Sequence, residues 1–294
     1  METADNKVFI TMFHKFSFKY RNKVIDSETM KSEKLVKLFT YLLMNHQRSL
    51  PSSELADMLW YFEDIDNPIG ALKNLVYRLR ALLKKEFGMS DFITTGKGAY
   101  SINPAYTISM DVSDFDICNN DLTNAQGNEA ELYQRLIQLY RGKFLSEIKG
   151  DHNILSKSAY YHSIYIGRVI EYANLLEENK EYAEMERLAR NAIEIDDLEE
   201  DLYEILIRAL YFQKQYKKAY EVYRSTTELL YEALGIKPSK SLQDLHNLIK
   251  KEIHEENVGY PRIVRVRGLP KITWGKELTC PFFVPNFLGF RIIL

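Results

Sequence analysis

The apolar positions change their period early in the chain. Phe16, Phe18 and Tyr20 alternate with polar residues, and a period of two is typical of a half-buried strand, so residues 8–25 are predicted to form β structure. The next apolar residues fall at helical spacing, at Leu35, Leu38, Phe39, Leu42 and Leu43. The pattern therefore predicts a small sheet followed by a helix with one buried face.

Two more helices are predicted after this one. The second spans residues 52–60, and Ser52 is its expected N-cap. The third spans residues 67–85, because Asn67 is a favourable N-cap and proline at the first helical position, Pro68, loses no required hydrogen bond. Three helices in close succession thus follow the small sheet.

A hairpin closes this part of the chain. Residues 91–104 contain a strand, a Gly-Lys-Gly turn and a second strand. A small sheet, three helices and a hairpin within residues 1–109 are the elements of a winged helix-turn-helix, an α+β domain. Residues 92–103 are then the wing.

Strand patterns end near residue 110, and helical patterns follow as far as residue 256. The predicted helices span residues 112–119, 128–141, 156–179, 181–195, 198–213, 215–234 and 239–254. NKEYAEMERLAR (179–190) aligns with QKQYKKAYEVYR (213–224) at an offset of 34 residues, the period of tetratricopeptide helix pairs. Residues 110–256 are therefore predicted to form an all-α, tetratricopeptide-like repeat domain, and the fold class is mainly α.

The composition changes again after residue 256. Residues 257–294 contain four of the eight prolines and no helical period, although residues 262–268 alternate like a strand. We interpret this segment as an unassigned tail, which could be a truncated further domain.

Charge is distributed unevenly although the whole chain is close to neutral. The formal net charge is −2, with 46% hydrophobic and 27% charged residues, which is ordinary for a globular protein. Residues 71–87 carry five bases and one acid, whereas residues 177–204 carry twelve acids and three bases. Such asymmetry points to nucleic-acid contact by the basic segment.

The polar face of the third helix has the residue types of a DNA-reading surface. Its inward stripe consists of Leu72, Leu75, Val76, Leu79, Leu82 and Leu83. The remaining face carries Lys73, Asn74, Tyr77, Arg78 and Lys84. Arginine can bond a guanine edge or a phosphate, asparagine can pair with adenine, and lysine and tyrosine often contact phosphates. A solvated basic face is the alternative, and the position of the helix in a winged helix-turn-helix favours DNA recognition.

Two further cations are candidate DNA contacts. Arg80 lies at an angle from which it either braces the fold or reaches the DNA backbone. Lys97 lies at the tip of the wing, where a cation can approach a phosphate or the minor groove. A flexible turn with a solubilising charge is the alternative for Lys97, and the turn lacks the spacing of a phosphate-binding P-loop.

No residue pattern predicts catalysis, a metal site or a cofactor. The six histidines show no paired metal-ligand spacing, and no Ser- or Cys-nucleophile motif occurs. The two cysteines are far apart, which indicates a reducing compartment. No apolar run approaches the roughly 18 residues of a membrane span, and we expect neither a signal peptide nor a membrane partner. A cytoplasmic protein that is not an enzyme is therefore expected.

These motifs together resemble one family of bacterial activators. The run KLVKLFTYLLMN, LADMLW, NPIGALKNLVYRLRALLKK and FITTGKGAYSIN, followed by MDVSDFD and helical repeats, is similar to proteins that join an OmpR-type winged helix to a bacterial transcriptional activator domain. These include the antibiotic-regulatory-protein activators. The resemblance covers residues 8–253.

The resemblance implies a transcriptional regulator that binds double-stranded DNA. Carried over by position, Lys73, Asn74, Tyr77 and Arg78 would face the DNA, and Lys97 would belong to the wing. The repeat domain would support self-association as a homodimer, or contact with an effector, RNA polymerase or another protein. The alternative hypothesis is a protein-interaction adaptor that uses the repeat surface and does not bind DNA.

Overall fold

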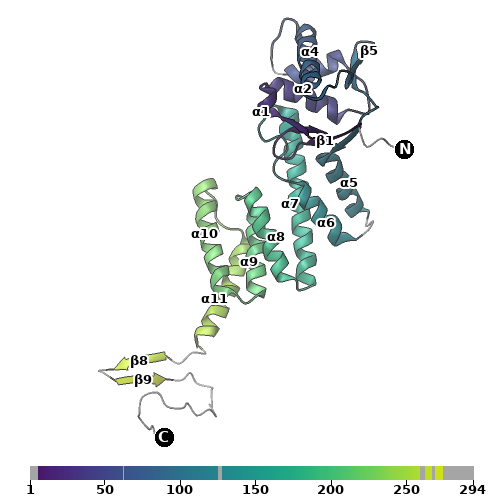
Figure 1. The fold of residues 1–294 in the computed structure, drawn as a ribbon. Helices are drawn as coiled ribbons and strands as arrows, with labels where there is room; N and C mark the ends of the chain where they lie inside the picture. Colours follow the sequence, from purple (N-terminus) through teal and green to yellow (C-terminus); the bar gives the residue numbers. More distant parts are fainter. Residues whose placement is uncertain (1–5, 62, 125–127, 259–261, 267–268, 274–294) are drawn as a thin grey trace. The chain divides into compact units, whose positions relative to one another are not determined.

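The chain consists of two compact units, residues 1–178 and residues 179–294. The computed structural model describes the whole chain except residues 1–5, 62, 125–127, 259–261, 267–268 and 274–294 (Figure 1). The boundary between the units differs from the predicted domain boundary at residue 110, because three helices that follow this residue belong to the first unit. The domain boundary at residue 110 stays a prediction.

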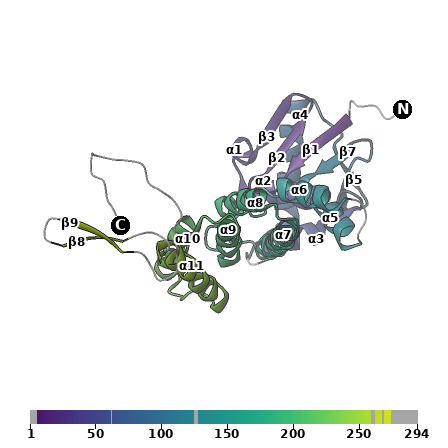
Figure 2. The ribbon, with the colours of Figure 1, turned by 90° about the horizontal axis from the view of Figure 1, so that it is seen from below.

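The first unit begins with a four-stranded sheet whose strand order is β3-β2-β1-β7 (Figure 2). Its strands are β1 (Lys7–Thr11), β2 (Ser17–Tyr20), β3 (Lys23–Asp26) and β7 (Thr107–Met110). β1, β2 and β3 are antiparallel neighbours, which confirms the predicted β structure of residues 8–25. The sequence patterns did not predict β7, which lies parallel to β1 and brings the chain back after the wing.

Helices and a second sheet complete a winged helix-turn-helix. The helices are α1 (Ser27–Met30), α2 (Glu33–Met44), α3 (Ser52–Trp60) and α4 (Pro68–Phe87). The second sheet has the order β4-β6-β5 and consists of β4 (Leu50–Pro51), β5 (Ile93–Gly96) and β6 (Ala99–Ile102). Phe18 of the first sheet contacts Phe39 of α2 and Phe92 next to β5, with ring centroids 5.0 and 5.3 Å apart. This buried aromatic contact joins both sheets to the helices.

The predicted N-cap of α3 is wrong by one residue. Ser52 is the first residue of the helix, and Pro51 precedes it without a side-chain cap. The Ser52 hydroxyl donates to the carbonyl oxygen of Gly98 at 2.7 Å instead, and the Ser52 backbone N–H reaches the same oxygen at 2.9 Å. The hydroxyl is therefore used to hold the wing, a partner that local sequence does not reveal.

Three helices after β7 pack into the first unit. They are α5 (Asp111–Thr123), α6 (Glu129–Leu139) and α7 (His152–Glu178). Their positions agree with the predicted helices, but α7 begins four residues earlier than residue 156, because Asp151 accepts hydrogen bonds from the backbone N–H groups of Asn153 and Ile154.

Two carboxylates of this helical part accept hydrogen bonds from the winged helix. The Asp111 carboxylate accepts from the backbone N–H groups of Met12 at 2.9 Å and Phe13 at 3.0 Å. The Glu147 carboxylate accepts from the Phe16 backbone N–H at 2.9 Å and the Ser27 hydroxyl at 2.7 Å. The bonds from Met12, Phe13 and Phe16 satisfy backbone N–H groups in the segment between β1 and β2, which belongs to neither strand.

An aromatic cluster lies beside these hydrogen bonds. Phe13 contacts the rings of Phe115, Tyr140 and Tyr161, with centroids 5.2, 4.9 and 5.3 Å apart. All four rings are at least 96% buried. Burial of this apolar area, in addition to the carboxylate hydrogen bonds, explains why residues 1–178 form one compact unit.

The Asp111 carboxyl makes stability depend on pH. Burial raises its pKa to about 6 against the lowering effect of the backbone N–H groups of Phe13, Met12 and Val112. A raised folded-state pKa gives a stabilisation that is complete below the ordinary carboxyl pKa and is lost as the pH rises through about 6. From about pH 8 to about pH 5, we expect the free energy of unfolding to rise by about 1 kcal/mol more in the wild type than in Asp111→Asn. Urea titrations at both pH values measure this, and equal pH dependence of the two proteins would contradict it.

The second unit is built from α8 (Tyr182–Ile195), α9 (Glu200–Phe212), α10 (Tyr216–Leu234) and α11 (Lys240–Val258) (Figure 1). The predicted offset of 34 residues is confirmed by the backbone. Lys180 before α8 and Lys214 before α10 have nearly equal left-handed φ angles, 62° and 60°. Two helix pairs thus start with the same turn, as expected for tetratricopeptide-like repeats.

The tail forms one short hairpin within its described residues. β8 (Arg262–Val266) pairs antiparallel with β9 (Leu269–Thr273), so the predicted strand at residues 262–268 is confirmed over its first five residues. Most of the rest of the tail lies outside the described residues. The interpretation of residues 257–294 as a truncated domain therefore stays a prediction.

Candidate nucleic-acid interface

The third predicted helix is α4, and it divides into a buried stripe and an exposed face. Five of the six residues in the predicted inward stripe are at least 93% buried, namely Leu72, Leu75, Val76, Leu79 and Leu83. Leu82 is half-buried at the edge of the stripe. The stripe packs against α2 and α3, so the opposite face of α4 is fixed toward solvent.

Local sequence fixes both ends of α4. The Asn67 side chain accepts a hydrogen bond from the Gly70 backbone N–H at 2.8 Å, which confirms the predicted N-cap. A Cβ at position 70 would lie 2.6 Å from the Asn67 amide nitrogen, so glycine leaves room for this cap. At the other end, Gly88 adopts φ 75° and its backbone N–H donates to the Lys84 carbonyl at 2.9 Å, a left-handed C-terminal stop.

The exposed face of α4 presents the predicted DNA-binding residues. Lys73, Asn74, Tyr77 and Arg78 are all exposed, and the Tyr77 side chain is 74% exposed although it is aromatic. Lys84 is exposed too, about 16 Å farther along the helix axis than Lys73 at 1.5 Å per residue. The structure therefore brings the first four together on the N-terminal half of α4, and Lys84 lies toward its C-terminal end.

The wing is a tight hairpin between β5 and β6. Gly96 pairs with Ala99, which leaves Lys97 and Gly98 as a two-residue turn with φ angles of 50° and 75°. Two positive φ angles are typical of a type I′ turn, whose twist matches that of paired strands. Lys97 is exposed at this tip, as predicted.

Arg80 braces the wing against α4. Its Nε and Nη2 atoms donate to the Ile93 carbonyl oxygen at 3.1 and 2.8 Å, and Nη2 also donates to the Thr95 hydroxyl at 2.7 Å. Of the two roles predicted for Arg80, the structure supports the brace. A contact of Arg80 with the DNA backbone stays a prediction.

The structure also places residues beside this face that the sequence patterns did not single out. A hollow of about 320 Å³ lies next to the exposed face and is lined in part by Lys34, Trp60, Asn74 and Arg78. The Lys34 ammonium lies 5.5 Å from the centre of the Trp60 ring. Because α2 and α3 are separate in sequence, only their packing brings these side chains next to α4.

Removal of the Arg80 brace will loosen the wing. Arg80→Ala deletes hydrogen bonds to a charged donor, which contribute about 1.5–3 kcal/mol when they are partly buried. We expect faster hydrogen exchange of the wing amides in residues 93–102 and a lower free energy of unfolding. Lys84→Ala is the matched control, because this exposed side chain on the same helix makes no contact with the wing among the described residues. Unchanged wing protection in Arg80→Ala would show that the brace is unimportant.

The described residues contain neither a cluster of metal ligands nor a helix that could span a membrane. No group of three or more His, Cys, Asp or Glu side chains in this part of the chain is placed to hold a metal ion. No helix there combines the length and the apolar character that a bilayer crossing requires.

Comparison with known proteins relates the chain to regulators of transcription. Residues 119–250 match the family model described as bacterial transcriptional activator domain. The regulatory protein AfsR of Streptomyces griseus is 23% identical over 269 residues, which cover 86% of this chain and 25% of that protein. The chain thus spans about a quarter of the length of this curated relative.

A solved structure has a similar fold. The structure titled Mycobacterium tuberculosis EmbR in complex with low affinity phosphopeptide matches with a TM-score of 0.59 and 14% identity. The match covers 83% of this chain and 65% of that one. At this level of identity the likeness concerns the fold alone, and it supports a winged helix followed by tetratricopeptide-like helices.

Proposed function

Because residues 119–250 match the model of the bacterial transcriptional activator domain and a winged helix precedes them, we propose that the chain is a sequence-specific, DNA-binding regulator of transcription. The observation that carries this proposal is that Lys73, Asn74, Tyr77 and Arg78 lie exposed together on one face of α4, the third helix of the winged helix-turn-helix. Such a protein works in the bacterial cytoplasm and is not an enzyme.

The exposed half of α4 is the reading surface in this proposal. The N-terminal residues of a recognition helix lie deepest in the major groove, and Asn74 and Arg78 have the donors and acceptors that distinguish base edges. Lys73 and Tyr77 would contact phosphates, which position the helix without reading sequence. Lys84 would meet the backbone farther along the helix.

The wing supplies a second contact beside the helix. Lys97 stands at the tip of a hairpin that Arg80 and Ser52 hold in place, so its position relative to α4 is defined. A lysine held in this way can reach a phosphate or the adjacent minor groove at little cost in chain entropy. The helical part would then serve self-association, or contact with an effector or RNA polymerase.

A titration of the purified chain against a genomic fragment library tests the proposal. We expect salt-sensitive binding to a subset of fragments, because each neutralised phosphate releases counterions and adds about 0.9 to the slope of log affinity against log salt. A protection footprint on a selected fragment will give the half-site spacing and therefore the dimer geometry. If no fragment binds and the chain instead co-purifies with a protein partner, the adaptor hypothesis is the correct one.

A further inference from the structure

A cleft of about 640 Å³ lies inside the first unit, and none of its lining residues belongs to α4. One wall is the outer face of α3, and the opposite wall is the segment Gly150–Asn153 at the start of α7. This volume is within the range of small-molecule sites in proteins, roughly 300–1,000 Å³. The cleft is thus large enough for a small organic molecule.

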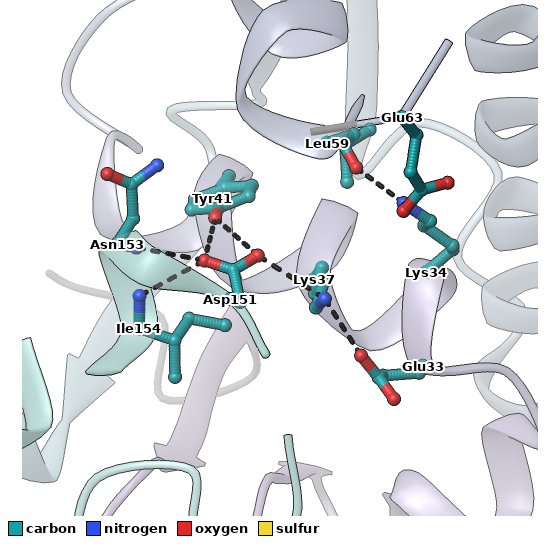
Figure 3. Close-up of polar contacts among 9 residues, drawn as sticks. All are labelled: Glu33, Lys34, Lys37, Tyr41, Leu59, Glu63, Asp151, Asn153 and Ile154. Carbon is teal, nitrogen blue, oxygen red and sulfur yellow. Dashed lines mark hydrogen bonds and ion pairs between the residues drawn. The ribbon is translucent and has the colours of Figure 1, made fainter. Parts of the chain in front are cut away.

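The floor of the cleft is a buried and fully paired polar network (Figure 3). The Asp151 carboxylate lies 3.3 Å from the Lys37 ammonium, and both side chains are only 8% exposed. The Tyr41 hydroxyl donates to Asp151 at 3.1 Å, and Glu33 lies 2.8 Å from the Lys37 ammonium. Burial by itself would lower the pKa of Lys37, but the carboxylates of Glu33 and Asp151 together outweigh burial, so the pKa is raised. The floor that a ligand meets is therefore a fixed network in which Lys37 stays protonated.

The walls of the cleft carry an excess of negative charge. Four carboxylates, those of Glu54, Asp57, Glu63 and Asp151, line the cleft together with the Lys37 ammonium. Three of them already have partners, since Glu54 pairs with Arg48, Glu63 with Lys34 and Asp151 with Lys37. Asp57 is exposed and makes no hydrogen bond or ion pair within the described part of the chain. It is the carboxylate left open to a cation.

Apolar groups lie beside the open carboxylate. Met58 and Tyr61 line the cleft together with Asp57, and the Tyr61 side chain is 73% exposed. An aromatic ring attracts a nearby cation through its face and also covers apolar surface. The cleft thus combines one available negative charge with apolar contact area.

We propose that this cleft binds a small organic cation, an ammonium or guanidinium group on an apolar stem. The cationic group pairs with Asp57, and the stem lies against Met58 and Tyr61. Because Gly150–Asn153 also line the cleft, a ligand that fills it would contact the start of α7 as well as α3. An effect of this ligand on DNA affinity would rest on the proposed function. Binding of the ligand to the cleft does not depend on that function.

A ligand series that differs only in charge tests the cleft without DNA. Phenethylammonium is the probe, 2-phenylethanol is its neutral counterpart, and phenylacetate is the anionic one. For phenethylammonium we expect a dissociation constant on the order of 1 mM, which is usual for a ligand of this size, and about tenfold weaker binding of the alcohol. Amide chemical shifts of the ¹⁵N-labelled chain measure both values and place the ligand at residues 53–61 and 150–153.

Asp57→Asn supplies the matched test of the charge. The side chain is exposed, so the variant is expected to fold, and it should bind phenethylammonium about two- to fivefold more weakly, the factor that an exposed ion pair contributes. Asp66→Asn removes an equally exposed carboxylate outside the cleft and should bind as the wild type does. Equal affinity for the cation and the alcohol, shifts elsewhere in the chain, or no binding would each overturn the proposal. None of these results would bear on DNA binding.

Discussion

Arg78→Ala will weaken specific DNA binding by about 10- to 100-fold, because loss of a base-reading arginine costs about 1–3 kcal/mol. Arg78 lies exposed on α4 and lines the hollow beside the recognition face. The loss should be greatest on the selected fragment and small on unrelated DNA, since an arginine that reads a base contributes to specificity. Fluorescence anisotropy with both DNAs measures the two affinities.

Lys73→Ala is the informative companion to this variant. If Lys73 contacts a phosphate, its loss weakens binding to all sequences alike and lowers the salt slope by about one. Lys19→Ala serves as the control, because Lys19 is exposed on β2 and not on α4. Circular dichroism and urea titration must show that all three variants are folded. If the folded Arg78→Ala and Lys73→Ala variants bind DNA as tightly as the wild type, α4 is not the recognition helix.

Asp151→Ala will lower the free energy of unfolding by about 3–5 kcal/mol, because it leaves a buried ammonium without one of its partners. The carboxylate also accepts hydrogen bonds from the Tyr41 hydroxyl and from two backbone N–H groups at the start of α7. One substitution therefore removes an ion pair, a helix cap and the partner of a buried hydroxyl. Urea unfolding followed by tryptophan fluorescence measures the loss.

A double variant separates the charge from the cap. Lys37→Met in the Asp151→Ala background removes the stranded ammonium, and we expect it to recover part of the lost stability. The recovery should be incomplete, since the backbone N–H groups of Asn153 and Ile154 still lack their acceptor. A loss below about 1 kcal/mol in Asp151→Ala would mean that water or Glu33 replaces the carboxylate, contrary to the buried geometry.

Most helices and strands of the chain follow from local patterns. The period of two in residues 8–25 corresponds to β1, β2 and β3, and the 34-residue offset corresponds to equal turns before α8 and α10. β7 was missed, because a short strand that pairs with a distant one has no distinctive local period. The cap of α3 was misplaced, since the Ser52 hydroxyl bonds the wing instead of its own helix.

The candidate interface was predicted in part. Helical spacing alone separates the leucine stripe from Lys73, Asn74, Tyr77 and Arg78, and the structure leaves these four exposed. Spacing could not choose between the two roles of Arg80, because its acceptors lie on β5, 13 and 15 residues away. Nor could it predict the hollow beside Asn74, to which Lys34 and Trp60 come from other helices.

The sequence by itself determined most of the order of elements, the polar face of α4 and the repeat, since each depends on neighbours within a few turns or on a regular period. The tertiary structure alone decided how the winged helix joins the helices after it. Asp111, Glu147 and Asp151 look like ordinary surface acids in sequence, yet they accept hydrogen bonds from groups 99, 131 and 110 residues away. Burial makes these carboxylates important, and burial depends on which distant segments pack together.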